Sequence, residues 1–388
     1  MSDRPIELSL VIPCLNEEKT LAAALKTARE AIAASGLEGE ILVADNGSTD
    51  GSRALAEACG ARVAAVRNRG YGFALAAGIQ AAQGRYLVMG DADATYDFRE
   101  AVPFVEELRK GADLVVGSRL RGRIEKGAMP FLHRYLGTPV LTTLINLFFG
   151  TKLSDCNGGL RAFTRSAYER MKIVSGGMEF ASEMLIKSAL AGLKIVEIPC
   201  SLLRDTRDKP PHLKTWRDGW RHLRFILLFA PHIVFTLPGW VFLAVGLAVT
   251  LTVLPRPVYF GSLRLDYHHL FYSIPLLCMG YQALWYAHFE RRFVRFTGLL
   301  PEVGGRSKDD DRFSLEGWLL TGSGLILLGV VLLGVILVRW FEASFGSLSQ
   351  IRQGTAAMLC MVLGLQTIMN ALIVSMMELK LNHLSSSD

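Results

Sequence analysis

The stretch Tyr86–Phe98, YLVMGDADATYDF, begins as a buried apolar run and ends in a cluster of carboxylates. An apolar run of this kind is typical of a strand that is covered on both faces. Asp91 and Asp93 follow it directly, and because they are two residues apart in an extended chain, both side chains point to one side. Two carboxylates on one side form either a solvated turn or a site for a hard cation such as Mg²⁺ or Mn²⁺. The stretch alone allows both interpretations.

Apolar strands and helices alternate on both sides of this stretch. Strands are expected at 8–13, 40–47, 61–66, 86–91 and 112–119, and helices at 17–35, 51–60, 73–83 and 98–111. This alternation predicts an α/β domain with a mostly parallel sheet covered on both faces. Ligands bind such sheets beyond the carboxyl ends of the strands. Asn16, Asp50 and Asp97 are expected to cap the helices that follow them.

The second half of the chain is strongly apolar. The 388 residues, 51% of them hydrophobic, are enough for one large domain and a second part. After about residue 224, four apolar runs are each close to the ~20 residues that a helix needs to cross a bilayer. They cover residues 232–254, 269–288, 316–338 and 355–377. Four such runs are hard to bury in a soluble protein of this size, so we expect an α-helical transmembrane domain with about four spans.

The distribution of basic residues predicts the orientation of these spans. Segment 289–315 holds six arginines and lysines, whereas 255–268 and 339–354 hold two each. The basic segment is therefore expected on the cytoplasmic side. With an even number of spans, the N-terminal domain and the C-terminal tail lie on that side too. The N-terminus has no signal pattern, and six scattered cysteines fit reduced thiols.

A basic amphipathic helix is expected between the two halves, over residues 211–230. Its apolar positions are Leu213, Trp216, Trp220, Leu223 and Leu227, and its basic positions are Lys214, Arg217, Arg221 and Arg224. Such a helix suits a lipid interface, and packing on the N-terminal domain is compatible with this. The expected organisation is a domain over 1–210, the interface helix over 211–230 and the membrane domain over 231–388.

Two further strand ends carry polar residues. The stretch 43–52, VADNGSTDGS, lacks the G-x-G-x-x-G pattern of a dinucleotide site. Asp45 either accepts hydrogen bonds from a base or ribose, or caps the turn. The stretch 115–127, VVGSRLRGRIEKG, is basic, and its Arg119 can bind phosphate through two parallel hydrogen bonds. An acidic and a basic group at one sheet edge predict a substrate whose phosphates are shared between a metal and arginine.

The ordered series of motifs over about residues 8–225 resembles the inverting glycosyltransferases of family 2. These motifs are VIPCLNEE, VADNGSTDGS, NRGYGFAL, GDADATYD, VVGSR and SDCNGGLRAF. The resemblance is greatest to the polyprenyl-phosphate branch, which includes dolichol-phosphate mannose synthase and bacterial undecaprenyl-phosphate sugar transferases. It implies the nucleotide-sugar-binding fold called GT-A, with a mostly parallel sheet, followed here by the α-helical transmembrane domain.

The resemblance also implies roles for individual residues. Donor binding falls to Pro13, Leu15, Glu17, Asp45, Asp91 and Ala92. A Mg²⁺ or Mn²⁺ ion would be held by Asp91, Asp93 and Thr95. The catalytic residues would be Asp91, Asp93 and Arg119. The acceptor phosphate would meet Arg119, Arg134, Arg207 and Lys209. Three positions depart from the family pattern: Asn46 replaces an acidic residue, Arg69 a common lysine, and Thr95 a common glutamine.

The implied reaction transfers a hexose from a GDP- or UDP-linked sugar to a polyprenyl phosphate, with inversion. The second pKa of a phosphate monoester is about 6, so the acceptor is largely anionic already and requires no strong general base. The expected partners are the nucleotide sugar, the lipid acceptor and the bilayer, with no nucleic acid. Association of the membrane helices into a homo-oligomer stays open.

Three alternatives compete with this interpretation. A processive polysaccharide synthase would typically show a Q-x-x-R-W motif, which this chain lacks. Transfer to another lipid or glycan hydroxyl would require a catalytic carboxylate, for which Glu179 and Glu183 of GGMEFASEML are candidates. We expect both instead to be solvent-facing acids at a helix start. A membrane scaffold with a degenerate transferase domain is disfavoured because Asp91, Asp93 and Arg119 are intact.

Overall fold

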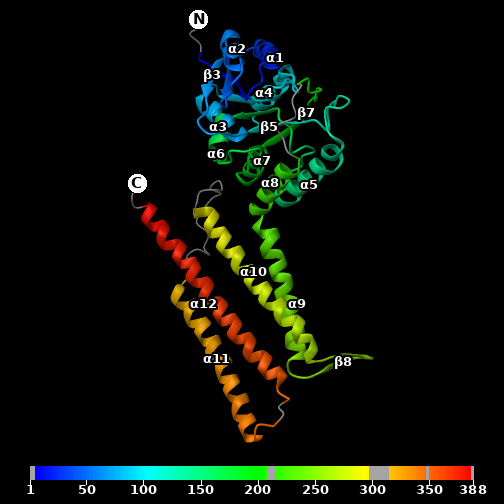
Figure 1. Ribbon diagram of the computed structural model, residues 1–388, viewed down its shortest axis with the longest axis vertical. Coiled ribbons are helices and arrows are strands. Elements are labelled where there is room, and N and C mark those ends of the chain that lie inside the picture. The colour runs from blue at the N-terminus through cyan, green and yellow to red at the C-terminus, as the bar shows by residue number, and fades with distance from the viewer. Residues whose placement is uncertain (1–4, 208–214, 297–313, 347–348, 386–388) are drawn as a thin grey trace. The chain divides into compact units, whose positions relative to one another are not determined.

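The computed structural model describes residues 5–207, 215–296, 314–346 and 349–385. The chain forms two compact units, and the boundary lies between Ala230 and Pro231 (Figure 1). The first unit contains a β-sheet with helices on both faces, and the second consists mainly of long helices.

The first unit is built on a seven-stranded sheet with the order β3-β2-β1-β4-β6-β5-β7. Its strands are β1 Leu8–Cys14, β2 Gly39–Asp45, β3 Arg62–Ala65, β4 Tyr86–Met89, β5 Leu114–Ser118, β6 Arg161–Thr164 and β7 Ile195–Pro199. Only β6 is antiparallel to its neighbours, which are β4 and β5. The expected mostly parallel sheet is confirmed, and the first five strands lie where the apolar runs predict them.

Helices cover both faces of this sheet. They are α1 Leu21–Ser35, α2 Ser52–Ala58, α3 Tyr71–Ala81, η1 Phe98–Ala101, α4 Val102–Arg109, η2 His133–Gly137, α5 Thr138–Phe149, α6 Arg165–Met171, α7 Phe180–Leu190 and α8 Thr215–Leu228. Leu10 and Ile12 belong to the core beneath α1 and α4, whereas Val11 belongs to the core beneath α3 and α7. Successive side chains of a strand point to opposite faces, so β1 contributes to both cores.

The predicted helix caps have different outcomes. The prediction for Asp97 is confirmed, because its carboxylate accepts a hydrogen bond from the backbone N–H of Arg99 at 3.0 Å. Asp50 accepts the N–H of Ser52, the first residue of α2, although the cap position itself is Gly51. The prediction for Asn16 is wrong, because α1 begins only at Leu21. Its side chain instead accepts the N–H of Thr49 at 2.7 Å and ties together the loops after β1 and β2.

Helix α8 packs on the first unit through one face and exposes the other. Asp218, His222 and Ile226 recur every four residues and are buried. Trp216 and Trp220 are 81% and 59% exposed, so the tryptophans expected on the apolar face remain free of the protein core. The predicted packing of the expected interface helix on the N-terminal domain is therefore confirmed, and its position at a lipid interface stays a prediction. Leu213 and Lys214 lie outside the described residues.

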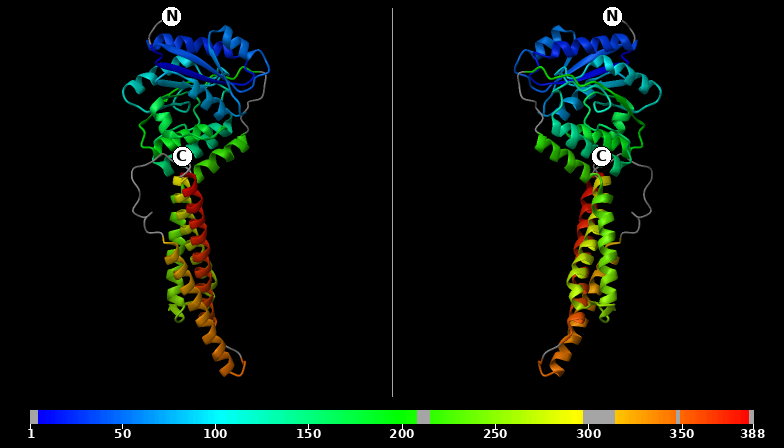
Figure 2. Two further views of the ribbon diagram at one scale, coloured as in Figure 1. Left: turned by 90° about the vertical axis from the view of Figure 1, so that its left-hand side faces the viewer. Right: turned by 90° about the vertical axis from the view of Figure 1, so that its right-hand side faces the viewer.

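The second unit contains four long helices that lie side by side (Figures 1 and 2). Its elements are η3 His232–Thr236, α9 Leu237–Val253, β8 Val258–Phe260, β9 Leu263–Leu265, η4 Tyr267–His269, α10 Leu270–Phe296, α11 Leu315–Glu342 and α12 Ile351–Ser385. In the described part of the chain, three helices are long and apolar enough to cross a membrane: His232–Val253, Leu315–Glu342 and Ile351–Met377.

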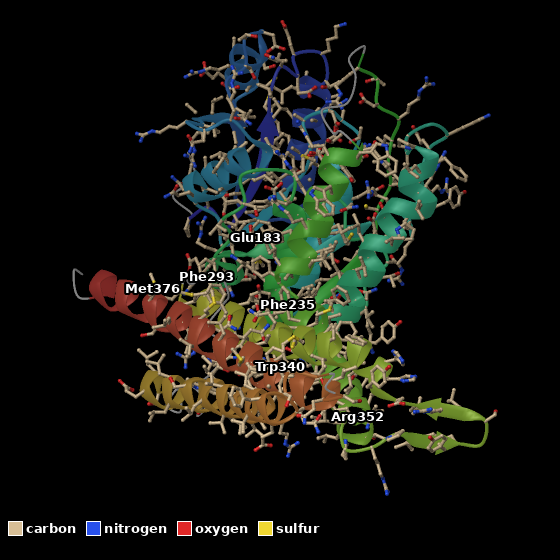
Figure 3. The ribbon with its side chains drawn as sticks, turned by 60° about the horizontal axis from the view of Figure 1, so that its bottom comes forward. Glu183, Phe235, Phe293, Trp340, Arg352 and Met376 are labelled. Atoms are coloured by element: carbon tan, nitrogen blue, oxygen red, sulfur yellow. The ribbon has the colours of Figure 1, made fainter. Side chains whose placement is uncertain are left out.

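The fourth expected span, 269–288, coincides with α10 but is not among these three. Polar residues such as Gln282, His288 and Glu290 lower its hydropathy. Gln282 is paired with α12, because it exchanges two 3.0 Å hydrogen bonds with Asn370. At the other end of α12, Arg352 pairs with Asp266, close to the β8–β9 hairpin (Figure 3).

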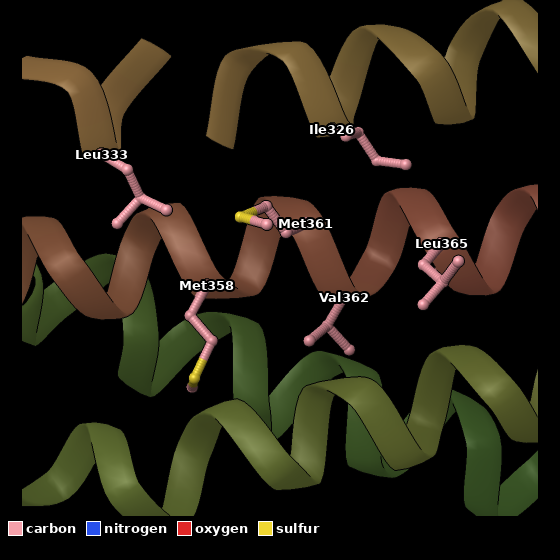
Figure 4. Close-up of a pocket in the computed structure, with 6 residues that line it drawn as sticks. All are labelled: Ile326, Leu333, Met358, Met361, Val362 and Leu365. Atoms are coloured by element: carbon pink, nitrogen blue, oxygen red, sulfur yellow. The ribbon is translucent and has the colours of Figure 1, made fainter. Parts of the chain in front are cut away.

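Helices α11 and α12 approach each other closely at glycines and leave an apolar groove beside the contact. The groove has a volume of about 480 Å³ (Figure 4). It is lined by Ile326, Leu333, Met358, Met361, Val362 and Leu365. An entirely apolar lining is what a helix pair surrounded by lipid tails is expected to present.

Two glycines of α11 offer a matched test of this helix contact. A methyl group added at Gly322 would lie 2.6 Å from Ile368 Cγ1 and 2.8 Å from the Gly364 carbonyl oxygen, whereas nothing lies within 4 Å of one added at Gly324. We expect Gly322→Ala to lower the free energy of unfolding by about 1–3 kcal/mol through overpacking. Gly324→Ala should raise it by up to about 1 kcal/mol through helix propensity.

The measurement is the thermal unfolding midpoint of each variant in detergent. Equal shifts in the same direction for both variants would contradict the close α11–α12 contact.

Candidate active site

Polar side chains gather where β1, β2, β4 and β5 end. Cys14 pairs with Asp45 and Val11 with Met89, so the residues that follow these three parallel strands reach one sheet edge. Strand β6 runs in the opposite direction, so the loop that precedes it meets the same edge. This loop contains the motif SDCNGGLRAF and brings acidic and glycine residues to the ends of β4 and β5.

Asp91 lies at the centre of this edge. The hydroxyl of Tyr71 donates to its Oδ1 at 3.0 Å. On its other side a Cβ at Gly159 would lie 2.7 Å from Asp91 Oδ2, so this position must be glycine for the loop to pass so closely. Burial, and then the charge of Asp93, raise the pKa of Asp91 to about 7. The repulsion between these two carboxylates makes a cation favourable here.

Asp93 is surrounded by hydrogen-bond donors. Both the backbone N–H and the hydroxyl of Thr95 donate to its Oδ1, at 3.1 and 2.6 Å. The guanidinium of Arg207 lies 3.0 Å from its Oδ2 and 2.6 Å from Glu17 Oε1. Arg207, expected at the acceptor phosphate, thus contacts two residues expected at the donor and the metal.

These residues fit a divalent cation that is completed by a ligand. Among the residues the structure describes, no group of three or more histidines, cysteines and acids is placed to hold a metal by itself. Asp91 and Asp93 offer two hard carboxylates, and the Thr95 hydroxyl lies against the second. Mg²⁺ and similar ions commonly take one or two carboxylates and complete their shell with water and substrate phosphates.

Arg119 is held rigidly by a carboxylate that the sequence motifs did not single out. Asp155 is fully buried, and its Oδ2 and Oδ1 accept hydrogen bonds from Arg119 Nε and Nη2 at 2.7 and 2.9 Å. Although burial acts to raise it, the pKa of Asp155 lies below its usual value because of Arg119. The Arg119 side chain is 14% exposed. A fixed, partly accessible guanidinium at this edge can bind a phosphate.

Asp155 is itself positioned by a second carboxylate. Glu197 of β7 accepts the backbone N–H groups of Ser154 and Asp155 at 2.8 and 3.0 Å. The edge strand β7, the loop before β6 and Arg119 after β5 therefore form one connected network.

The expected donor residues lie together at the ends of β1, β2 and β4. Pro13 and Leu15 are half-buried, and Glu17, Asp45 and Ala92 are buried. Asp45 Oδ1 accepts the N–H of Ser48 at 3.0 Å, so it caps the turn as one interpretation predicts. Its neighbour Asn46 bonds through its side chain to the backbone of Gly70, within the motif NRGYG.

The residues expected at the acceptor are more scattered. Arg134 is exposed on η2, with its guanidinium over the ring of Tyr135. Burial, and then the charge of Arg119, lower the pKa of the adjacent His133. Lys209 lies outside the described residues.

Glu183 is not a solvent-facing acid, which corrects the prediction. It is fully buried, and its carboxylate pairs with Lys187 Nζ at 2.7 Å (Figure 3). It also accepts the backbone N–H groups of Val174 and Ser175 at 3.0 and 2.8 Å. A carboxylate occupied in this way is unsuited to act as a general base. The prediction for Glu179 is also wrong in part, because one of its carboxylate oxygens, Oε2, is buried.

The sequence motifs do not predict the roles of Tyr71 and Asp155 in the site. Both lie in motifs that the resemblance includes, NRGYG and SDCNGGLRAF. The signal was therefore present in the chain, but the contacts depend on the pairing of β6 with β4 and β5.

Comparisons with known proteins identify the family of this chain. The family model described as "Glycosyl transferase family 2" matches residues 9–172, and that described as "Glycosyltransferase family 2 C-terminal transmembrane region" matches 288–378. The second match and the three apolar helices indicate a membrane protein.

Among curated proteins, the chain is similar to the low-salt glycan biosynthesis hexosyltransferase Agl6 of Haloferax volcanii. The two are 34% identical over 379 residues, covering 96% of this chain and 89% of the relative. It is 29% identical to the dolichyl-phosphate hexose transferase of the same organism, over 50% of this chain and 81% of that protein. Among solved structures, glucosyl-3-phosphoglycerate synthase of Mycobacterium tuberculosis matches with a TM-score of 0.44 and 23% identity, over 58% of this chain and 78% of that one.

The Arg119–Asp155 pair gives a prediction for stability. Asp155→Ala leaves a largely buried guanidinium without its partner, so we expect a loss of about 3–5 kcal/mol in the free energy of unfolding. Asp113→Ala removes an exposed hydrogen bond to the N–H of Lys194 and should cost about 1 kcal/mol. Thermal unfolding of both variants in detergent measures the difference. Similar losses for both variants would show that the Asp155 contact is not a structural anchor.

Proposed function

The chain belongs to glycosyl transferase family 2 and is a glycosyltransferase of the membrane, and from this premise we propose that it transfers a hexose from a GDP- or UDP-linked sugar to a polyprenyl phosphate. The product is a polyprenyl-phosphate monosaccharide, formed with inversion. The similarity to a dolichyl-phosphate hexose transferase supports this class of acceptor.

One observation supports the proposal: the cation after β5 is held in place by a carboxylate, and Glu183, a candidate general base, is already paired. Arg119 is oriented by Asp155 through two hydrogen bonds, and Glu183 is paired with Lys187. A hydroxyl acceptor would require a general base, whereas a phosphate monoester is largely anionic near neutral pH. A site that provides an oriented guanidinium, and in which Glu183 is committed to an ion pair, suits the phosphate acceptor.

The proposed mechanism relies on positioning. Residues of the β1, β2 and β4 ends hold the nucleotide, with Asp45 at the base or ribose. Asp91 and Asp93 would hold Mg²⁺ or Mn²⁺, and the ion would supply charge stabilisation for the nucleoside diphosphate leaving group. Arg119 reduces the repulsion between the acceptor phosphate and the donor diphosphate and orients the attacking oxygen. In-line attack by this oxygen on the anomeric carbon breaks the bond to the diphosphate and inverts the centre.

The surface of the first unit supports a lipid acceptor. Phe131 and Tyr135, beside and within η2, and Trp216 and Trp220 of α8 are large and exposed. Helices α5 and α8 are in contact, so these aromatic side chains belong to neighbouring elements. Arg134, Arg217, Arg221 and Arg224 are distributed among them. Aromatic and cationic side chains together suit an anionic lipid interface. We place this surface on the cytoplasmic face of the membrane, where the basic segment 289–315 is expected.

The acceptor assignment is tested with purified protein. We expect that undecaprenyl or dolichyl phosphate, a panel of GDP- and UDP-hexoses and Mg²⁺ or Mn²⁺ give a lipid-linked monosaccharide with at least one donor. The matched control is the corresponding prenol, which has the same chain without the phosphate and should not react. Glycosylation of the prenol, or of no lipid phosphate with any donor, would refute the proposed acceptor.

The cation site is tested by substitution. Asp93→Ala should lower turnover below detection, because it removes a carboxylate from the proposed metal site. Asp97→Ala removes a carboxylate only four residues away that caps η1, so turnover should persist after a stability loss of about 1 kcal/mol. Undiminished turnover of Asp93→Ala would exclude the metal role of this residue.

A further inference from the structure

Glu179 is the acidic residue of the GGMEF stretch that the proposed mechanism leaves without a role. It occupies the N-cap position of α7, yet its side chain makes no capping hydrogen bond. Its Oε2 is buried and has no hydrogen-bond partner. A buried carboxylate oxygen without a donor is costly, and native structures rarely retain one without a reason. Side-chain capping of α7 therefore does not explain the position of Glu179.

The segment that carries Glu179 is rigidly held. Glu183 accepts the N–H groups of Val174 and Ser175, and the Gly176 carbonyl oxygen accepts the N–H of Phe73 at 3.2 Å. The carboxylate of Glu179 folds back over Gly177, where a Cβ would lie 2.5 Å from its Oε2. The position of Glu179 is thus set by α7 and by the N-terminus of α3, not by a free loop.

This segment borders the site around Asp91. The backbone of Gly176 packs on Gly70, and that of Ser175 on Gly72, so the residue between them, Tyr71, lies directly beneath the segment. Tyr71 is the residue whose hydroxyl donates to Asp91. The segment with Glu179 therefore lies one side chain away from the proposed diphosphate and metal site.

A second element encloses Glu179 from α8. His222 is buried and its Nδ1 lies 2.7 Å from the hydroxyl of Ser182, in the first turn of α7. Burial lowers the pKa of His222, and the neighbouring carboxylates of Glu179 and Asp218 act against this shift. Arg161 donates to the carbonyl of Ala181 in the same turn. Glu179 thus borders a polar region made by α7, α8 and the start of β6.

The chemistry of an ionised carboxylate limits what its ligand can be. It accepts hydrogen bonds and donates none, so it requires a ligand with O–H or N–H groups. A phosphate at neutral pH offers few donors and carries the same charge, and an isoprenoid chain offers none. The one component of the proposed reaction rich in O–H donors, beyond the nucleotide, is the hexose of the donor.

We propose that Glu179 accepts hydrogen bonds from hydroxyl groups of the donor hexose and is a specificity-determining residue of the site. This inference rests on the proposed function. It makes Glu179 a ligand for the sugar and not a general base, which the proposed phosphate acceptor does not require.

The test compares binding of two ligands that differ only in the sugar. From a panel of UDP- and GDP-hexoses, the nucleotide sugar with the largest thermal stabilisation of the wild-type protein is chosen, together with its nucleoside diphosphate. Calorimetry then measures both ligands. Glu179→Ala should weaken the nucleotide sugar about tenfold or more, the size of one hydrogen bond to a charged group, and leave the nucleoside diphosphate nearly unchanged. Retained diphosphate binding also shows that the variant is folded.

Two further variants sharpen the result. Glu179→Gln keeps an acceptor oxygen and should weaken the nucleotide sugar less than Glu179→Ala, whereas a general base would make both variants equally inactive with unchanged donor binding. Glu169→Ala, an exposed glutamate of α6, should change neither ligand.

Equal weakening of both ligands by Glu179→Ala, or no weakening of either, would overturn the sugar contact and leave the proposed function intact. A wild-type protein that binds no nucleotide sugar of the panel would overturn both.

Discussion

A fully buried guanidinium holds together the two segments on which the site depends. Arg161, the first residue of β6, donates to the carbonyl oxygens of Gly158, Ala181 and Cys156 at 2.9, 2.6 and 2.7 Å. All three acceptors are backbone groups, and burial lowers the pKa of Arg161. The protein tolerates this buried cation because the three hydrogen bonds satisfy the guanidinium. They also give a partner to three backbone carbonyl groups that would otherwise need one. The loop before β6 and the first turn of α7 are thereby fixed to each other.

The geometry of the site follows from this fixed pair of segments. The loop before β6 carries Asp155, which orients Arg119, and Gly159, which passes close to Asp91. Glu179 is the N-cap of α7, and Glu183 in the first turn of this helix holds the segment above Tyr71. Arg119 and Glu179 are thus placed by different segments with one common anchor. This arrangement allows the two groups to be positioned without direct contact between them.

The sequence predicts well what depends on local pattern. Alternating apolar segments locate β1 to β5, and the ends of these strands locate Asp45, Asp91 and Arg119. It fails where a contact depends on strand direction. Nothing local in RAFT indicates that β6 is antiparallel, and without that fact Asp155 is only a polar residue in a loop. Asn16 fails for a related reason: its side chain bonds to Thr49 of the next loop, a partner far along the chain that competes with local capping.

Glu183 shows the same limit in a helix. An acid near a helix start is usually solvated, and the neighbouring sequence gives no sign that Lys187, four residues later, is buried with it. The spacing allows an ion pair, but only the packing of α7 against the sheet shows that both charges are inside. The segment before α7 uses that pair to satisfy two backbone N–H groups. Its function in the fold is therefore recognisable only once the tertiary contacts are known.

The hydropathy of helix α10 likewise depends on contacts that the sequence does not show. Helix α10 falls short of the apolar helices because it contains groups such as Tyr281 and Gln282. These groups are paired with Thr367 and Asn370 of α12, so their cost in a lipid environment is reduced by a partner helix. Hydropathy summed along one helix cannot register this compensation. If α10 is counted as a span, the helices make four crossings, the even number that the apolar runs of the sequence predict.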